Sequence, residues 1–131
     1  MKTVINPPEM AAPTGYSYAI KKTGMPVFIS GQVALDGKGT LVGENDVAAQ
    51  VEQVFANLRS VVGACGGTLD DVVKITIYVT DINQRQGVHK ARQEYFSGDF
   101  PTATTVQVVA LADPAYRVEI DVIAHIGAGG R

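Results

Sequence analysis

The chain has 131 residues, of which 46% are hydrophobic and 18% charged, and this composition predicts one soluble globular domain spanning residues 1–131. A net charge of −2 at pH 7 argues against a nucleic-acid partner, and no apolar run approaches the ~20 residues that a membrane span requires. The single cysteine, Cys65, rules out an intramolecular disulfide and favours a reducing, cytoplasmic location.

The first third of the chain is expected to hold an arm and two strands. Residues 1–15 contain Pro7, Pro8 and Pro13, which disfavour regular structure, and they lack the apolar segment of a signal peptide. Residues 16–21 and 27–32 are predicted strands, joined by a turn at 23–26.

An amphipathic helix is the clearest element that the sequence predicts. Asn45 or Asp46 is its expected N-cap, and Gly66 and Gly67 supply the glycine that commonly ends a helix. Between them, apolar side chains recur at helical spacing on one face: Val47, Val51, Val54, Phe55, Leu58, Val61, Val62 and Cys65. This face needs a sheet or another helix to cover it.

The C-terminal half predicts a strand, a helix and two further strands. A strand at 72–80 is followed by a capping-box pattern at 81–84, which opens a second helix that ends near Phe96. Strands follow at 102–110 and 117–126, and residues 127–131 are expected to form a flexible tail. In the last strand apolar and polar residues alternate strictly, as in a strand buried on one face. The element order predicts an α+β fold in which two helices cover one face of one mixed sheet.

The other face of the predicted sheet is where we expect function. It carries the carboxylate of Glu119 beside a strand of hydroxyls, Thr102, Thr104 and Thr105. By parity, apolar and aromatic side chains share this face, so it is neither polar nor apolar throughout. A monomer would expose this mixture to water, whereas a ring of subunits would bury it.

Several ordered blocks of the sequence resemble the RidA/YjgF family over nearly the whole chain. They are PTGYSYAI, VFISGQVALD, DVAAQVEQVFANLRSVVGACGGTLDDVVKITIYVTDI, FPTATTVQVVAL and YRVEIDVIA. The resemblance implies a chorismate-mutase-like sandwich that assembles as a homotrimer, with small-molecule pockets at the subunit interfaces. It also implies an activity, because archetypal members hydrolyse reactive enamines and imines such as 2-aminoacrylate to 2-keto acids and ammonia.

The resemblance assigns roles to individual residues. Glu119 matches the glutamate that positions the attacking water, and Tyr16 matches an aromatic residue of the pocket. The turn whose backbone approaches the ligand corresponds to Ser30, Gly31 and Gln32.

This sequence departs from the family at the arginine that grips the substrate carboxylate. In the segment that the family writes as Pro-x-Arg-Ser, this chain has Pro101-Thr-Ala-Thr, so Ala103 stands at the position of the arginine, and Thr105 at that of a neighbouring cysteine of many members. Ala103, Thr104 and Thr105 are the positions on this strand that the resemblance places in the pocket. Alanine offers neither charge nor donor, so classical 2-imino acid deamination is not expected. Arg92 and Arg117 are alternative sources of the missing cation, although a solvated position on the helix surface is expected for Arg92.

Two functions from different classes fit these residues. In the first, Glu119 activates water against a C–N or related bond of a small metabolite. In the second, the chain is a non-catalytic metabolite-binding or chaperone-like trimer. Ribonuclease activity is not expected of an acidic chain without a basic stripe. Neither a metal nor a cofactor is expected, since His89 and His125 lack ligand spacing.

Overall fold

The computed structural model describes residues 1–127. Its elements in chain order are β1 (Lys2–Ile5), β2 (Ala19–Lys22), β3 (Met25–Gln32), α1 (Val47–Ala64), the 3₁₀ turn η1 (Leu69–Asp71), β4 (Val72–Val79), the 3₁₀ turn η2 (Ile82–Gln84), α2 (Arg85–Tyr95), β5 (Thr102–Gln107) and β6 (Val118–Ile126). Most of the predicted C-terminal tail, residues 128–131, lies outside the described residues.

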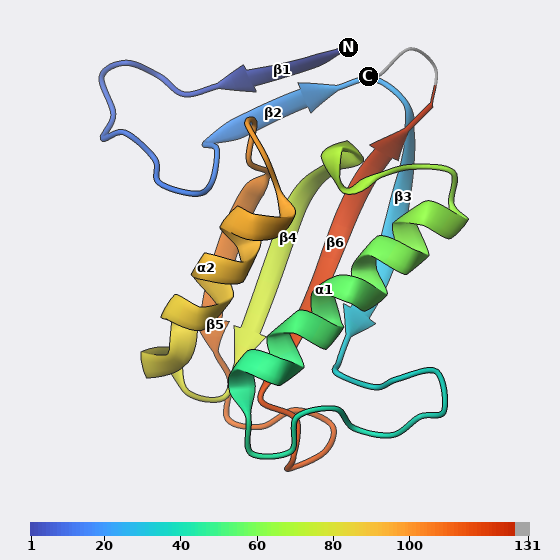
Figure 1. Cartoon of the computed structure of the whole chain (residues 1–131). Helices are drawn as coiled ribbons and strands as arrows, with labels where there is room; N and C mark the ends of the chain where they lie inside the picture. The colour runs from blue at the N-terminus through green and yellow to red at the C-terminus, as the bar shows by residue number, and fades with distance from the viewer. Residues whose placement is uncertain (128–131) are drawn as a thin grey trace.

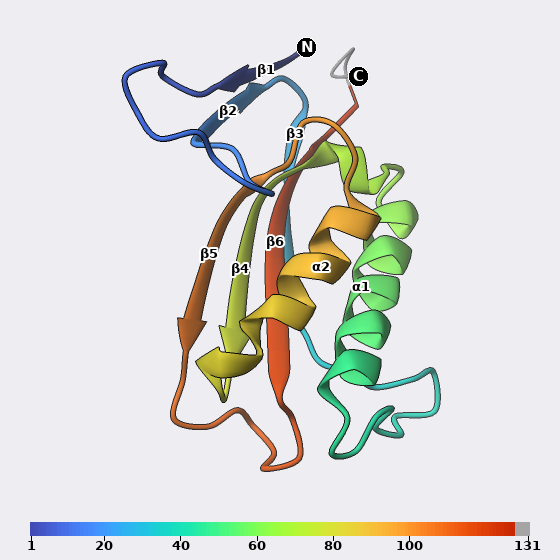
Figure 2. The ribbon, with the colours of Figure 1, turned by 60° about the vertical axis from the view of Figure 1, so that its left-hand side comes forward.

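Four strands form the main sheet in the order β3-β6-β4-β5, and both helices lie on one of its faces (Figure 1, Figure 2). β6 pairs antiparallel with β3 and with β4. β4 and β5 run parallel because α2 crosses over between them. The sheet is therefore mixed, and the predicted α+β class with two helices over one face is confirmed.

The hydrophobic core lies between the helices and the main sheet. Along the whole of β6 the side chains alternate between buried and half-buried, as its period-two pattern predicted. The largest fully buried apolar side chains of the core are Phe55, Leu58, Ile75, Ile77 and Ile120. Removing this apolar surface from water is the dominant favourable term in folding.

Asp46, one of the two residues predicted as the N-cap of α1, takes that position in the structure. Its Oδ1 accepts a hydrogen bond from the backbone N–H of Ala49 at 3.2 Å, which satisfies a donor that the first helical turn leaves unpaired. Asp46→Ala is expected to lower the free energy of unfolding by about 1 kcal/mol. Asp46→Asn keeps a cap and is the control; urea denaturation that finds equal losses for both variants would contradict the capping role.

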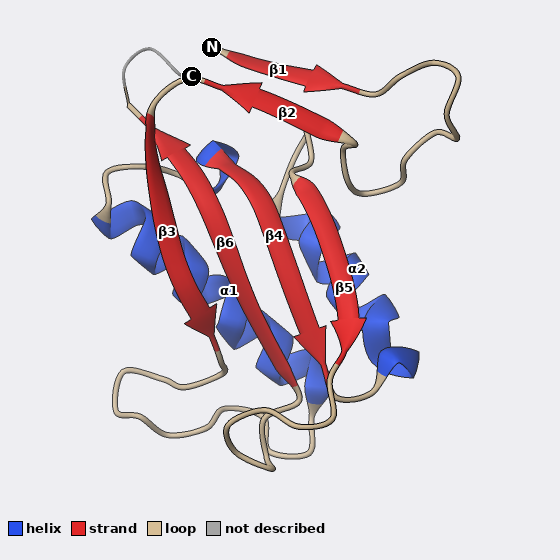
Figure 3. Ribbon diagram, turned by 180° about the vertical axis from the view of Figure 1, so that it is seen from behind, coloured by secondary structure: helices blue, strands red, loops and turns tan. Residues whose placement is uncertain are grey.

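The N-terminal arm differs from the prediction. Lys2–Ile5 form β1, which pairs antiparallel with β2 in a separate two-stranded sheet across one end of the main sheet (Figure 3). The three prolines, which disfavour regular structure, all follow this strand, so they end it and do not prevent it. β2 belongs to this small sheet and begins at Ala19, later than predicted.

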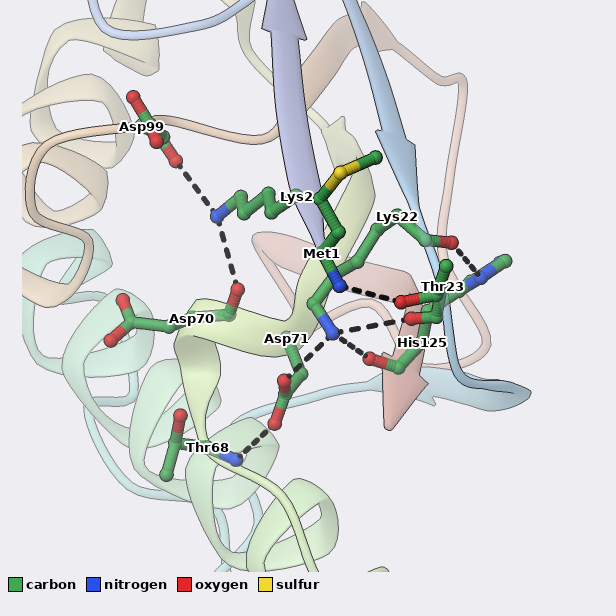
Figure 4. Close-up of polar contacts among 9 residues, drawn as sticks. All are labelled: Met1, Lys2, Lys22, Thr23, Thr68, Asp70, Asp71, Asp99 and His125. Atoms are coloured by element: carbon green, nitrogen blue, oxygen red, sulfur yellow. Dashed lines mark hydrogen bonds and ion pairs between the residues drawn. The ribbon is translucent and has the colours of Figure 1, made fainter. Parts of the chain in front are cut away.

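A buried ion pair fixes the small sheet to the rest of the domain (Figure 4). Nζ of Lys22, at the end of β2, lies 3.1 Å from Oδ1 of Asp71 in η1, and the two side chains are 1% and 0% exposed. The same ammonium donates to the carbonyl oxygen of His125 in β6. Oδ2 of Asp71 accepts from the backbone N–H of Thr68 at 2.9 Å. Three segments far apart in the sequence therefore meet at one charged pair.

The placement of β5 also differs from the prediction. β4 lies between β5 and β6, so the hydroxyl strand is not the neighbour of Glu119. Thr105 pairs with Ile77, whose side chain is buried beneath the helices, and so Thr105 faces the helices and not the open face. The sequence TATTVQ has no strict apolar alternation that would have shown which face each residue takes.

Within residues 1–127, no helix covers the other face of the main sheet (Figure 3). Polar side chains of β4 and β6, among them Glu119, share this open face with apolar ones such as Phe28, which is 76% exposed. The mixed character that the sequence predicted is therefore present. Neither helix of the described chain has the length and apolar character needed to cross a membrane.

Candidate functional site

Glu119 lies on the open face of the main sheet against an irregularity in β3. The pairing of β3 with β6 shifts between Ile29 and Gln32, which places a bulge at Ser30 and Gly31. A Cβ added to Gly31 would lie 2.1 Å from Oε2 of Glu119, so the carboxylate packs directly on the glycine backbone. Only a residue without a Cβ permits this approach. We call Ser30, Gly31, Gln32 and Glu119 the glutamate half-site.

The carboxylate of Glu119 is half-buried and forms no hydrogen bond or ion pair within residues 1–127. Its cross-strand neighbour is Tyr78, whose hydroxyl donates to Oδ2 of Asp121 at 3.2 Å. The Asp121 carboxylate, with burial, this hydrogen bond and Glu119, raises the pKa of Tyr78 above its usual value. The hydroxyl of Tyr78 thus stays protonated at neutral pH and donates to Asp121, not to Glu119. The carboxylate of Glu119 is therefore available to interact with a bound molecule.

β5 presents its three predicted site residues to two different faces. Ala103 pairs with Ile75 and packs against the core beneath the helices, and Thr105 lies on the same side. Thr104, between them, is exposed on the open face. Because Ala103 carries no charge, a cation near this strand has to come from another element.

A cavity of about 210 Å³ lies between α2 and β5. Its lining residues, which we call the arginine pocket, are Arg85, Gln86, His89, Arg92 and Thr105. Arg85, His89 and Arg92 are spaced four and three residues apart, so they share one face of α2. The lining contains two arginines and no carboxylate.

Arg92 is only 6% exposed, so the expectation that it lies in solvent on the helix surface is wrong. Its Nε donates to the carbonyl oxygen of Gly15 at 3.1 Å, and its Nη2 donates to Nδ1 of His89 at 2.7 Å. A guanidinium has no acceptor, so Nδ1 must accept and a neutral His89 carries its proton on Nε2. Burial, together with the charge of Arg92, lowers the pKa of His89, which keeps the imidazole neutral at pH 7.

The N-terminal arm borders the arginine pocket. Gly15 has a φ of +74°, and a Cβ there would lie 2.6 Å from Cε1 of His89, so only glycine can bring this carbonyl to the guanidinium. Ser17 is anchored by its backbone N–H, which donates to the carbonyl oxygen of Pro101 at 3.2 Å. Tyr16, the predicted aromatic residue, lies between these two buried positions and is half-buried itself.

The predicted residues therefore form two groups in one chain. The glutamate half-site belongs to β3 and β6, whereas the arginine pocket belongs to β5 and α2, and β3 and β5 are the opposite edges of the sheet (Figure 3). Arg117 joins neither group, since its Nη2 donates to Oδ1 of Asn45 at 3.3 Å in the loop before α1. Within residues 1–127, no cluster of three or more histidine, cysteine or acidic side chains is arranged to hold a metal ion.

This chain is similar in fold and in sequence to several known proteins. A crystal structure of YyfB from Yersinia pestis, a protein of unknown function of the conserved Rid protein family, superposes with a TM-score of 0.89 at 34% identity, covering 95% of this chain and 98% of that one. A RutC family protein of Pyrococcus horikoshii is 35% identical over 126 residues, 95% of this chain and 98% of that protein. A 2-iminobutanoate/2-iminopropanoate deaminase of Dermatophagoides farinae is 32% identical over 126 residues, 95% of this chain and 97% of that protein.

The family profile described as endoribonuclease L-PSP matches residues 7–126, which includes both groups of site residues. The chain belongs to this family, the RidA/YjgF family, and its chorismate-mutase-like fold is that of the solved Rid structures.

Proposed function

We propose that the chain forms a homotrimer that hydrolyses a C–N or related bond of a small metabolite at its subunit interfaces, with Glu119 as general base. The position of the Glu119 carboxylate carries this proposal. It is half-buried on an open sheet face and has no hydrogen bond or ion pair within residues 1–127. A carboxylate in that state can take a proton from a bound water. The similarity to a protein described as an imine deaminase supports a small-metabolite substrate.

The separation of the two groups favours a site shared by two copies. Each group lies at one edge of the sheet, so a single chain offers half of the polar groups that the family resemblance assigns to one pocket. In a closed ring, the glutamate half-site of one subunit would meet the arginine pocket of the next. The same contact would cover the exposed Phe28 and the rest of the open face.

The chemistry on an imine needs water as its only co-reactant. Water beside Glu119 adds to the carbon of the protonated C=N bond while the carboxylate takes one of its protons, which gives a neutral carbinolamine. That proton then passes from Glu119 to the carbinolamine nitrogen. The C–N bond breaks as the carboxylate takes the proton of the carbinolamine hydroxyl, so that ammonia and a carbonyl product leave and the last proton is released with the ammonia. Gly31 holds the carboxylate in place by packing against it.

The test is ammonia release by the purified full chain from imines generated in situ by an amino-acid oxidase, with the mass of the assembly from light scattering. Turnover by a trimer supports the proposal. A monomer would contradict it, as would ligand-induced thermal stabilisation without any ammonia release, which favours the metabolite-binding alternative. RNA is included as a substrate because of the profile's name, and no cleavage is expected.

Gly31→Ala is expected to lower turnover by about 10- to 100-fold, because the new Cβ displaces the Glu119 carboxylate from its position. Gly31 does not adopt a positive φ, so we expect a change in the free energy of unfolding below about 1 kcal/mol. The control is Gly63→Ala on α1, where an added Cβ meets nothing within 4 Å. Steady-state kinetics and urea denaturation of both variants separate the two effects, and equal kinetics would contradict the assigned contact.

A further inference from the structure

The arginine pocket holds a buried cation to which the described chain provides no counter-ion. Arg92 is 6% exposed, and its hydrogen bonds go to a carbonyl oxygen and to a neutral imidazole. The salt bridge found within residues 1–127 joins Lys22 to Asp71 and does not involve Arg92. Charged side chains are rarely buried without a partner, because removing an ion from water is costly. An anion from outside the chain would supply that partner.

The guanidinium of Arg92 retains one free edge. Nε and one N–H of Nη2 are engaged by Gly15 and His89. A guanidinium has five N–H donors, so three remain, two on Nη1 and one on Nη2. The Nη1–Nη2 edge can bind a carboxylate through two parallel hydrogen bonds. The hydroxyl-bearing Thr105 lines the same cavity opposite α2 and offers a further donor.

Arg85 adds a second cation at the solvent side of the cavity. It is exposed, lies two helical turns before Arg92 on the same face of α2, and lines the same cavity. Its Nη1 donates to the carbonyl oxygen of Ile82 at 3.1 Å, which orients the side chain without neutralising it. Seven residues of helix rise ~10.5 Å, a separation that two long arginine side chains can shorten toward a shared ligand.

We propose that the arginine pocket binds a small dianion, with one carboxylate on buried Arg92 and a second acidic group on Arg85 at the mouth. The inference rests on the proposed function only in treating this pocket as part of the substrate site. A cavity of about 210 Å³ is below the usual range of drug-sized pockets, ~300–1,000 Å³, and suits a metabolite. The anchor comes from α2 and not from β5, so Ala103 is compatible with an acidic substrate.

Calorimetric titration of the full chain compares 2-oxoglutarate with 2-oxopentanoate, which has the same length but ends in a methyl group. We expect 2-oxoglutarate to bind about three- to fivefold tighter, the range of a partly exposed ion pair. Equal affinities for the two ligands would overturn the assignment of a dianion.

Three variants locate the two charges. Arg92→Gln, which keeps a donor for Gly15, is expected to weaken both ligands at least about tenfold. Arg85→Gln is expected to abolish the preference for 2-oxoglutarate and to leave 2-oxopentanoate unchanged. Arg59→Gln on α1, whose guanidinium lies over the Tyr95 ring, makes the same change in net charge away from the pocket and is the control. The proposal would be refuted if Arg85→Gln still preferred 2-oxoglutarate, or if Arg92→Gln bound both ligands as tightly as the unaltered chain.

If Arg92→Gln fails to fold, Arg92→Lys replaces it. Lysine keeps the charge but lacks the fork, so both ligands are expected to bind more weakly than to the unaltered chain, and equal binding would contradict the bidentate contact. Binding and turnover by the unaltered chain separate this inference from the proposed function. If the unaltered chain binds 2-oxoglutarate in preference to 2-oxopentanoate but turns over no imine, hydrolysis is rejected and the anion site is kept. If it turns over an imine but shows no preference for the dianion, the anion site is rejected and hydrolysis is kept.

Discussion

Glu119→Gln is expected to lower kcat/KM for hydrolysis by about 10²- to 10⁴-fold, the usual contribution of a general base. Glutamine has nearly the same shape as glutamate and still packs on Gly31, but its amide cannot take a proton from water. The fold and the assembly should persist, since Glu119 forms no hydrogen bond or ion pair within residues 1–127. Steady-state ammonia release, with light scattering and a melting curve on the same preparations, measures all three quantities.

Asp121→Asn is the matched control for that experiment. Asp121 lies two residues further along β6 on the same open face and loses the same charge on substitution, but its Oδ2 is already engaged by the hydroxyl of Tyr78. We expect this variant to keep turnover within a few-fold of the unaltered chain. Undiminished turnover in Glu119→Gln, or an equal loss in both variants, would remove Glu119 from the role of base.

The sequence predicted those parts of the fold whose pattern is local. The helical periodicity of α1 and the strict alternation of β6 each involve many residues, and both elements match the structure within a few residues at their ends. β1 was missed because a strand of four residues has little periodicity, and it is stabilised by pairing with β2, about 17 residues further along. The prediction that β5 lies beside β6 was wrong, because α2 joins β4 to β5 as parallel neighbours.

The candidate site was predictable only where one residue carries the signal. Glu119 stands out as a carboxylate in a strictly alternating strand, whereas Gly31 was assigned only through the family resemblance; the structure brings the two into contact. The burial of Arg92 had no local signal, because α2 is polar on most of its surface and the covering carbonyl belongs to Gly15, 77 residues away. Gly15 itself was an available clue, since an isolated glycine can mark a close approach of the backbone to another segment.

The ion pair between Lys22 and Asp71 is an interaction whose loss should strongly destabilise the domain (Figure 4). Neither residue stands out in the sequence, because the pair joins β2 to η1 across 49 positions and only the Thr68-x-x-Asp71 capping pattern has a local signature. Both side chains are almost fully buried, and removing one takes from the other the opposite charge that compensates its burial. The small sheet would then be held less firmly, by contacts such as those of the Lys2 ammonium with the carbonyl oxygens of Asp70 and Asp99.

We expect Asp71→Asn and Lys22→Met each to lower the free energy of unfolding by about 3–5 kcal/mol, as for other broken buried ion pairs. The double variant should lose less than the sum of the two, because no charge remains buried and the two residues are in contact. Asp70→Asn is the control: the neighbouring side chain is exposed, so its loss of charge should change stability by less than ~0.5 kcal/mol. Urea denaturation at one fixed protein concentration gives all four values. A strictly additive double variant, or an Asp71→Asn no less stable than Asp70→Asn, would show that this pair does not hold the small sheet in place.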